Sequence, residues 1–124
     1  MKINKRNRLE SVRVSDSPNF SDRTHEEISL LVIHNISLPP GEFGNHFVYD
    51  FFTNQLDPAQ DPYFEEIYEM KVSSHLFIDR EGQITQFVPF AKAAWHAGIS
   101  EFKGKENCNE FSIGIELEGT DDLD

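Results

Sequence analysis

Two residues at the ends of apolar runs could perform chemistry together. His34 closes a run that begins at Leu30, and Glu116 lies near the end of a second run that begins at Phe111. A neutral imidazole is a good zinc ligand. A carboxyl group in apolar surroundings has a raised pKa that suits it to proton transfer. If two buried strands bring His34 and Glu116 into one cleft, the pair supplies the parts of a metal-assisted hydrolase.

The sequence leaves a structural interpretation open for both residues. A histidine at a strand end is more often hydrogen-bonded than metal-bound, and Glu116 could lie on a solvated strand face. Strand alternation places Gly114, Glu116 and Glu118 on one face and the apolar residues between them on the other. Two acids and a glycine on one face favour a cleft floor over a core.

The segment 94–98 adds an aromatic residue and a histidine flanked by small residues. Trp95 could be a platform for a sugar or peptide, or part of the core. His96 precedes two small residues that let a ligand approach the backbone. His75 could compete for a ligand role, or be a hydrogen-bonded structural histidine. The single cysteine, Cys108, is predicted to be a buried small apolar residue.

The elements that must position these side chains follow from apolar patterning and turn residues. The pattern predicts two buried strands, two helices and a hairpin. A further short strand is expected before a polar loop. In chain order they are a strand at 29–35, a loop at 36–44, helices within 47–56 and 62–70, a hairpin of 72–78 with 83–88, a strand at 95–97, a loop at 100–109 and a strand at 111–117. Two helices among at least four strands indicate an α/β or α+β fold.

Length and charge limit the range of functions. The 124 residues support one domain, divided here into an N-terminal arm and lead-in (1–24) and a domain portion (25–124). The net charge is -11, and residues 1–23 carry six Lys/Arg against three Asp/Glu. The acidic remainder excludes nucleic acid as a partner. The sequence shows no membrane span and no signal peptide. A single cysteine cannot form an internal disulfide, which agrees with a reducing compartment. We therefore expect the protein to be cytoplasmic.

Four strings of residues together resemble a known family. They are the strings at 31–44, 88–90, 94–98 and 108–121, within a resemblance that covers about residues 14–124. The family is Amidase_2, which shares the peptidoglycan-recognition-protein fold and contains zinc-dependent N-acetylmuramoyl-L-alanine amidases.

The resemblance implies a central mixed sheet flanked by helices, one Zn²⁺ ion and a muropeptide substrate. It implies hydrolysis of the amide between the lactyl group of N-acetylmuramic acid and L-alanine, as in cell-wall recycling. His34 matches the first zinc ligand, and Glu116 matches the acid that handles the proton of the zinc-bound water. The residues that would line the muropeptide groove are Asn35, Trp95, His96, Ala97 and Gly98.

Three departures from the family pattern affect these expectations. Ser74 stands where distant relatives of the fold often carry a tyrosine near the metal, and Asn107 stands where a basic residue is usual. The family's second zinc histidine, its aspartate ligand and a catalytic lysine lie in a C-terminal stretch without counterpart here. We therefore expect an incomplete amidase domain with His34 as its one family-matched zinc ligand, or else a non-catalytic muropeptide-binding module of the same fold.

Overall fold

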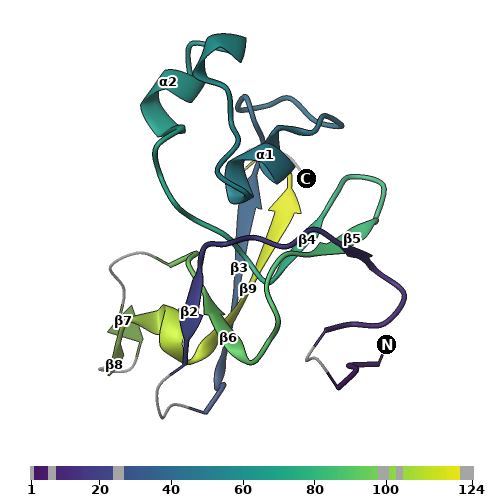
Figure 1. The fold of residues 1–124 in the computed structure, drawn as a ribbon, viewed down its shortest axis with the longest axis vertical. Coiled ribbons are helices and arrows are strands. Elements are labelled where there is room, and N and C mark those ends of the chain that lie inside the picture. Colours follow the sequence, from purple (N-terminus) through teal and green to yellow (C-terminus); the bar gives the residue numbers. More distant parts are fainter. Residues whose placement is uncertain (1, 6–7, 24–26, 98–100, 103–104, 121–124) are drawn as a thin grey trace.

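The centre of the fold is a five-stranded mixed sheet, which the computed structural model shows with the two short α-helices at one end (Figure 1). The structure describes residues 2–5, 8–23, 27–97, 101–102 and 105–120. From one edge to the other the strands are β1 (Arg13–Val14), β5 (Ile84–Gln86), β4 (Leu76–Ile78), β9 (Ser112–Glu118) and β3 (Leu30–Ile36). β4 and β5 form the predicted antiparallel hairpin, and the other three pairs are parallel. The expected α+β class is confirmed.

One row of residues crosses the whole sheet in register. Arg13 pairs with Thr85, Thr85 with Phe77, Phe77 with Glu116, and Glu116 with His34. Side chains of residues in register point to the same face, and neighbouring strands lie roughly 4.8 Å apart. The two candidate catalytic residues are therefore nearest neighbours on one face, although 81 positions separate them in the sequence.

The two faces of the sheet are covered unequally. On β9 the face with Gly114, Glu116 and Glu118 is buried, whereas the isoleucines between them are half-buried. On β3, the outermost strand, Leu31 and Ile33 are 58% and 57% exposed. The apolar face is thus the open one. Sequence alternation predicted which residues share a face, but the acidic face was expected to be a cleft floor and is instead covered.

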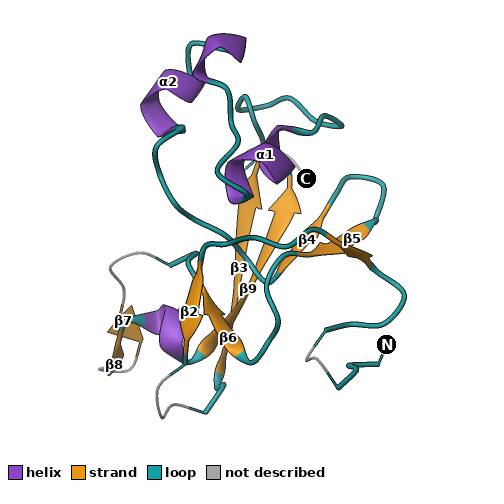
Figure 2. Cartoon of the chain, viewed as in Figure 1, coloured by secondary structure: helices purple, strands orange, loops and turns teal. Residues whose placement is uncertain are grey.

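A phenylalanine-rich core packs on the acidic face. Residues of α1 (Phe47–Phe52) form one cluster with Phe77 of β4 and with Phe87, which follows β5, and Phe52 meets Phe87 edge-to-face with ring centroids 5.0 Å apart. α2 (Phe64–Ile67) adds the fully buried Phe64. Both helices lie where the sequence predicts helices but are shorter, because turns and irregular segments occupy the rest of the predicted ranges, and the 3₁₀ helix η1 (Pro58–Gln60) lies between them (Figure 2). Among the described residues, no helix has the length and apolar character needed to cross a membrane.

Two smaller sheets extend the fold. β2 (Phe20–Asp22) pairs antiparallel with β6 (Lys92–Ala94), and β7 (Glu101–Phe102) pairs with β8 (Lys105–Glu106). The predicted strand at 95–97 is wrong, because the strand ends at Ala94. The segment expected to be a loop, 100–109, contains β7, β8 and the start of the 3₁₀ helix η2 (Cys108–Glu110). Cys108 is buried, as predicted.

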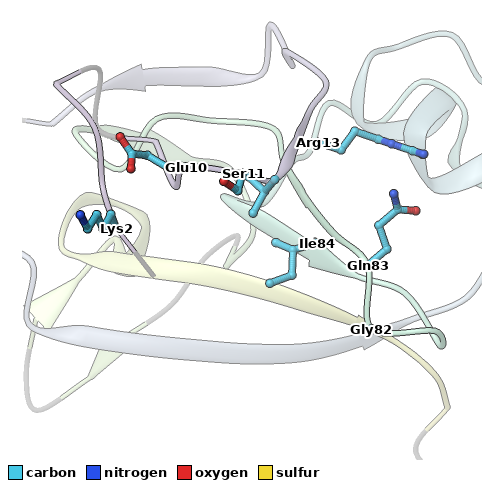
Figure 3. A pocket seen from close by; sticks show the side chains of 8 residues that line it. Lys2, Glu10, Ser11, Arg13, Gly82, Gln83 and Ile84 are labelled. Atoms are coloured by element: carbon cyan, nitrogen blue, oxygen red, sulfur yellow. The ribbon is translucent and has the colours of Figure 1, made fainter.

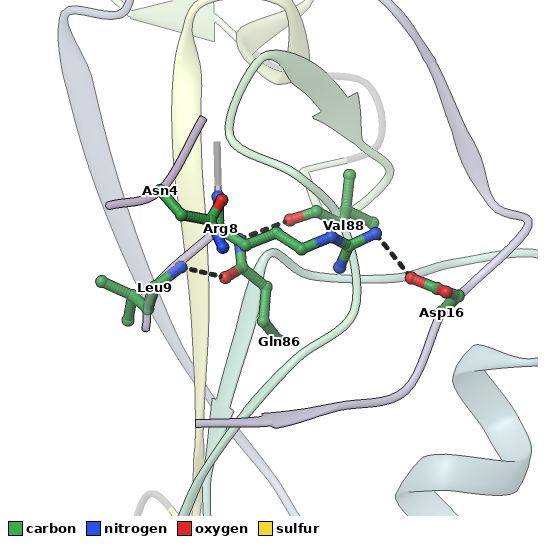
Figure 4. Close-up of polar contacts among 6 residues, drawn as sticks. All are labelled: Asn4, Arg8, Leu9, Asp16, Gln86 and Val88. Atoms are coloured by element: carbon green, nitrogen blue, oxygen red, sulfur yellow. Dashed lines mark hydrogen bonds and ion pairs between the residues drawn. The ribbon is translucent and has the colours of Figure 1, made fainter. Parts of the chain in front are cut away.

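The N-terminal stretch is attached to the sheet rather than solvated along its length. β1 pairs with β5, and the Gln86 side chain accepts a hydrogen bond from the Leu9 backbone N–H (2.7 Å) while donating to the Val88 carbonyl (2.9 Å) (Figure 4). Arg8 forms an ion pair with Asp16. Residues 1–24, expected to be an arm and lead-in, thus contribute β1 and β2 to the sheets of the domain.

The open apolar face should cause self-association of the 124-residue chain. Contiguous exposed apolar surface favours protein–protein contact, and β3 is an edge strand whose outer side pairs with no described strand. We expect sedimentation velocity to show concentration-dependent association. The double variant Leu31→Lys/Ile33→Lys should reduce it strongly, because both side chains are exposed and their replacement costs little core packing. Met70→Lys, at an equally exposed position outside the sheet, is the control. Equal association of all three chains would contradict the prediction.

Candidate active site

Glu116 is a buried acid without a hydrogen-bond partner for one of its oxygens. The residue is 9% exposed, and within the described part of the chain its Oε2 atom has no donor. Burial raises the pKa of the Glu116 carboxyl to about 8. Perturbed carboxyl groups of this kind concentrate at functional sites. Beside it in register, His34 is half-buried, so part of the residue remains accessible to solvent.

His34 contacts His96, which in turn contacts Ser112. The Nε2 atom of His34 lies 3.4 Å from Nδ1 of His96, and Nε2 of His96 lies 2.9 Å from the Ser112 hydroxyl. Burial, reinforced by the nearby His75, His34 and Arg23, lowers the pKa of His96 to about 4. Its side chain is therefore neutral near pH 7 and lies inside the candidate site.

Gly114 provides the space for the His96 ring. A Cβ atom built on Gly114 would lie 2.5 Å from the ring, closer than real contacts allow. The glycine on the predicted cleft floor thus admits a histidine side chain of the protein itself.

His75 is a structural histidine. It is fully buried, and the Gly114 backbone N–H donates to its Nδ1 atom at 3.1 Å. A neutral imidazole carries one ring proton, so the proton lies on Nε2, which donates to the Lys92 carbonyl at 2.7 Å. Both ring nitrogens are therefore engaged by backbone groups. Of the two interpretations open in the sequence, the structure supports the hydrogen-bonded one.

The residues expected to line a substrate groove do not all lie together. Asn35 alternates with His34 along β3 and belongs to the opposite face, so this geometry gives no support to its place in the same groove. Trp95 is half-buried, and its indole N–H donates to the Ser21 hydroxyl of β2 at 3.2 Å. The backbone N–H of Ala97 donates to Asn109 Oδ1 at 2.9 Å. Gly98 lies outside the described residues.

Sequence reasoning missed the side chains that hold the site together. The Arg23 guanidinium donates to four carbonyls, which belong to Phe90, Asn109, Glu110 and Ser112. Asn109 Oδ1 accepts the backbone N–H groups of His96 and Ala97. Arg23 and Asn109 carry no local pattern that predicts these contacts, although Asn109 does lie in one of the strings shared with the family.

Glu118, the second acid on this face, has a structural role. Its carboxylate accepts the Gly44 backbone N–H at 2.8 Å and the Arg80 backbone N–H at 3.0 Å. Gly44 belongs to the loop after β3, and Arg80 belongs to the β4–β5 turn. Both oxygens of Glu118 are thus satisfied, in contrast to Glu116.

The described residues do not complete a zinc site. A catalytic zinc takes three protein ligands, and no group of three or more His, Cys, Asp or Glu side chains lies close enough in the described part of the chain. His34 is partly accessible to solvent and Glu116 has an unpaired oxygen beside it, but His75 is held by the backbone and Glu118 by its two donors. The ligand set present therefore does not fit zinc without further residues.

Two cavities of mixed polar and apolar lining lie away from the candidate site. One, of about 580 Å³, lies between the N-terminal segment and the β4–β5 turn (Figure 3); its lining residues are Lys2, Glu10, Ser11, Val12, Arg13, Gly82, Gln83 and Ile84. The other, of about 430 Å³, is lined by residues that include Arg80 and Glu118. Neither is lined by His34 or Glu116. The candidate site is therefore identified from the chemistry of its side chains and not from either of these cavities.

Comparison with known proteins identifies the family. The family model Amidase_2, described as N-acetylmuramoyl-L-alanine amidase, matches residues 24–124. The chain belongs to the Amidase_2 family. Among curated relatives, the 1,6-anhydro-N-acetylmuramyl-L-alanine amidase AmpD of Haemophilus influenzae is 56% identical over 115 residues, which are 92% of this chain and 62% of the relative. AmpD of Escherichia coli K12 is 53% identical over 116 residues, 93% of this chain and 63% of the relative.

Solved structures agree with the family assignment. A crystal structure of a selenomethionine AmpD derivative is similar with a TM-score of 0.96 at 52% identity, covering 99% of this chain and 69% of that one. An endolysin from Bacillus subtilis, 21% identical with a TM-score of 0.50, shows a likeness of fold alone. The chain spans slightly less than two thirds of the length of the AmpD relatives named above.

The state of His75 predicts a loss of stability in acid. Burial, opposed in part by the bond to Lys92 and reinforced by Arg23, lowers the pKa of His75 from 6.5 to about 4. The unfolded chain then binds more protons than the folded chain between these values, so stability is full above about pH 6.5 and falls as the pH drops toward 4. The loss is at most about 3 kcal/mol for this residue.

Urea unfolding at pH 7 and pH 5 measures this effect. His75→Gln should lower stability at pH 7, because one amide cannot replace both ring contacts, and should reduce the pH dependence. The remainder of the dependence belongs to groups such as His96. The exposed His46→Gln is the control and should retain the parent's dependence. A pH dependence unchanged by His75→Gln would show that the ring is not held neutral by the fold.

Proposed function

We propose that this chain contributes the His34–Glu116 part of the catalytic centre of a zinc-dependent N-acetylmuramoyl-L-alanine amidase, acting on (1,6-anhydro)muropeptides in cell-wall recycling. The observation that carries the proposal is the in-register pair of an accessible histidine and a buried acid whose Oε2 lacks a donor. Family membership over residues 24–124 supports the substrate class. Identity of 56% to an AmpD amidase supports the anhydro form of the sugar.

In the proposed reaction water cleaves the amide between the lactyl carbonyl and the nitrogen of L-alanine. The C–N bond breaks, the carbonyl carbon gains a hydroxyl group from water, and the nitrogen gains a proton. In this proposal Glu116 takes the proton from water and returns it to the leaving nitrogen. A pKa of about 8 lies close to physiological pH, where a group that must both accept and release a proton works best.

The metal and the cellular location belong to the same proposal. His34 is the ligand that this chain contributes to zinc, and further ligands must come from outside the described residues. We place the protein in the cytoplasm, which agrees with the single cysteine of this sequence, Cys108, being buried.

Trp95, His96 and Ala97 remain our candidates for the groove wall. Support comes from the Asn109 side chain, which fixes the backbone of His96 and Ala97 beside the His34–Glu116 pair. Trp95 follows Ala94, the last residue of β6, and its ring is anchored to β2 through Ser21. A rigid aromatic of this kind contributes contact area at low entropic cost.

A second candidate function is binding without catalysis. The incomplete ligand set in the described residues favours it for the 124-residue chain taken alone. The same groove would then hold a muropeptide that is not cleaved. Isothermal titration with anhydromuropeptide, combined with chromatographic analysis of the mixture, separates binding from hydrolysis.

A chimeric protein tests the catalytic proposal. Residues 1–124 are joined to the C-terminal third of H. influenzae AmpD, whose length this chain matches to 62%. We expect the chimera to release the peptide from anhydromuropeptide. Glu116→Ala should lower kcat by roughly 100-fold or more, the usual contribution of a general acid–base group. Glu65→Ala, an exposed acid on α2, is the matched control and should retain full activity.

Two results would contradict this assignment. A Glu116→Ala chimera within about threefold of the parent rate would remove Glu116 from the mechanism, since loss of a general base costs far more. An inactive but folded parent chimera that binds muropeptide would favour the binding module.

The amount of zinc retained after dialysis should differ between the 124-residue chain and the chimera. A single imidazole binds zinc too weakly for the ion to remain bound during dialysis, whereas three protein ligands retain it. We expect elemental analysis of the dialysed 124-residue chain to find far less than one zinc per chain, and the chimera to retain about one. His34→Ala should abolish retention by the chimera. One zinc held tightly by the 124-residue chain would show that it has a full ligand set of its own.

A further inference from the structure

We propose that Asn109 is a positioning residue for the candidate groove wall, residues 95–97, and that it acts through its side-chain oxygen without touching the substrate. The wall continues the chain beyond β6, whose pairing with β2 ends at Ala94. The effect of Asn109 on substrate binding rests on the proposed function, but the contacts that hold the wall do not.

The backbone N–H groups of the wall all donate to side-chain oxygens. Trp95 donates to the Ser73 hydroxyl at 3.1 Å. His96 and Ala97 both donate to Asn109 Oδ1, at 3.1 Å and 2.9 Å. In a sheet, such donors pair with the backbone carbonyls of a neighbouring strand. The shape of the wall therefore depends on the identity of two side chains.

The two donors that converge on Asn109 identify the atom that they contact. An amide nitrogen only donates hydrogen bonds, whereas an amide oxygen has two lone pairs and can accept two. The atom between the His96 and Ala97 N–H groups is therefore the oxygen. An alanine at this position would leave two N–H groups of half-buried residues without their acceptor, which is unfavourable.

Asn109 controls only the second part of the wall. The Trp95 backbone is held by Ser73 in both directions, because the Trp95 carbonyl also accepts the Ser73 backbone N–H at 3.0 Å. The Trp95 indole is bound separately to Ser21. Loss of the Asn109 side chain should therefore release His96 and Ala97 and leave Trp95 in place.

Asn109 is itself fixed to the beginning of β9. It lies in η2, and Nη1 of Arg23 donates to the backbone carbonyls of Asn109 and Glu110 at 3.1 Å and 3.0 Å. Nη2 of Arg23 donates to the Ser112 carbonyl, in the first residue of β9, at 2.9 Å. Because β9 also carries Glu116, Asn109 sets the position of the wall relative to the strand that holds the candidate catalytic acid.

Amide hydrogen exchange, measured by nuclear magnetic resonance on the ¹⁵N-labelled 124-residue chain, tests these contacts directly. Asn109→Ala should speed the exchange of the His96 and Ala97 N–H groups by about tenfold, because local opening no longer breaks a hydrogen bond. Asn109→Asp retains an oxygen acceptor, now charged, and should keep both groups protected. The acceleration in Asn109→Ala should exceed any change in the β9 amides, which report a general loss of stability.

Two control variants show whether the effect is local to each acceptor. Ser73→Ala removes the acceptor of the Trp95 N–H and should speed the exchange of Trp95, with His96 and Ala97 remaining protected. Asn45→Ala removes another asparagine whose Oδ1 accepts a backbone N–H, that of Phe47 at 3.0 Å. It should speed the exchange of Phe47 and leave the wall unchanged.

Kinetics of the AmpD chimera test the role in substrate binding. Asn109→Ala should raise KM for anhydromuropeptide several-fold and change kcat by less than about twofold, because the wall contacts the substrate and takes no part in proton transfer. A residue needed only for folding would instead lower the apparent kcat at an unchanged KM. Asn109→Asp should restore the parent KM in roughly 0.5 M salt, which screens the added charge.

Either of two results would overturn the proposal. Unchanged exchange of His96 and Ala97 in Asn109→Ala would show that this side chain does not hold the wall. Slow exchange combined with a raised KM in Asn109→Asp would show that Asn109 touches the substrate through its amide nitrogen. An inactive chimera would leave the exchange rates unaltered, so failure of the proposed function is distinguished from failure of this inference.

Discussion

The parallel pairing of β3 with β9 is the constraint on which the rest of the structure depends. Seven consecutive residue pairs are in register, and the pair His34–Glu116 is one of them. A slip of one residue would move every side chain of one strand to the other face and separate the two. β9 is held against such a slip along its length: Arg23 binds the Ser112 carbonyl, His75 accepts the Gly114 N–H, and Glu118 anchors two loops.

The sequence predicted where the main strands lie better than it predicted what packs against them. The strands expected at 29–35 and 111–117 each lie one residue further along, because strongly apolar β-branched runs determine strands locally. Which face of β9 is buried depends instead on what packs against it. The phenylalanine core settles on the face with Glu116, and the isoleucine face remains open. A rule that places apolar residues inside would have chosen the opposite face.

The site could be predicted in the same partial way. His34 and Glu116 were recognisable as candidates because residue type and position at the end of an apolar run are local properties. The roles of Ser112, Asn109 and Arg23 depend on contacts with residues 12 to 89 positions away, for which no local pattern exists. Asn35 illustrates a limit of the shared strings: the prediction followed from adjacency to His34, whereas alternation along the strand places the two residues on opposite faces, which gives that prediction no support.

The Glu118 side chain links two surface segments that are far apart in the sequence. Its two oxygens hold the loop around Gly44 and the turn around Arg80, and the Arg80 guanidinium lies 4.4 Å above the centre of the Phe43 ring. Loop and turn are therefore braced twice, once through backbone and once through side chains. Their stiffness is a joint property, so a substitution in the β4–β5 turn that removes the bond to Glu118 would also loosen the loop around Gly44.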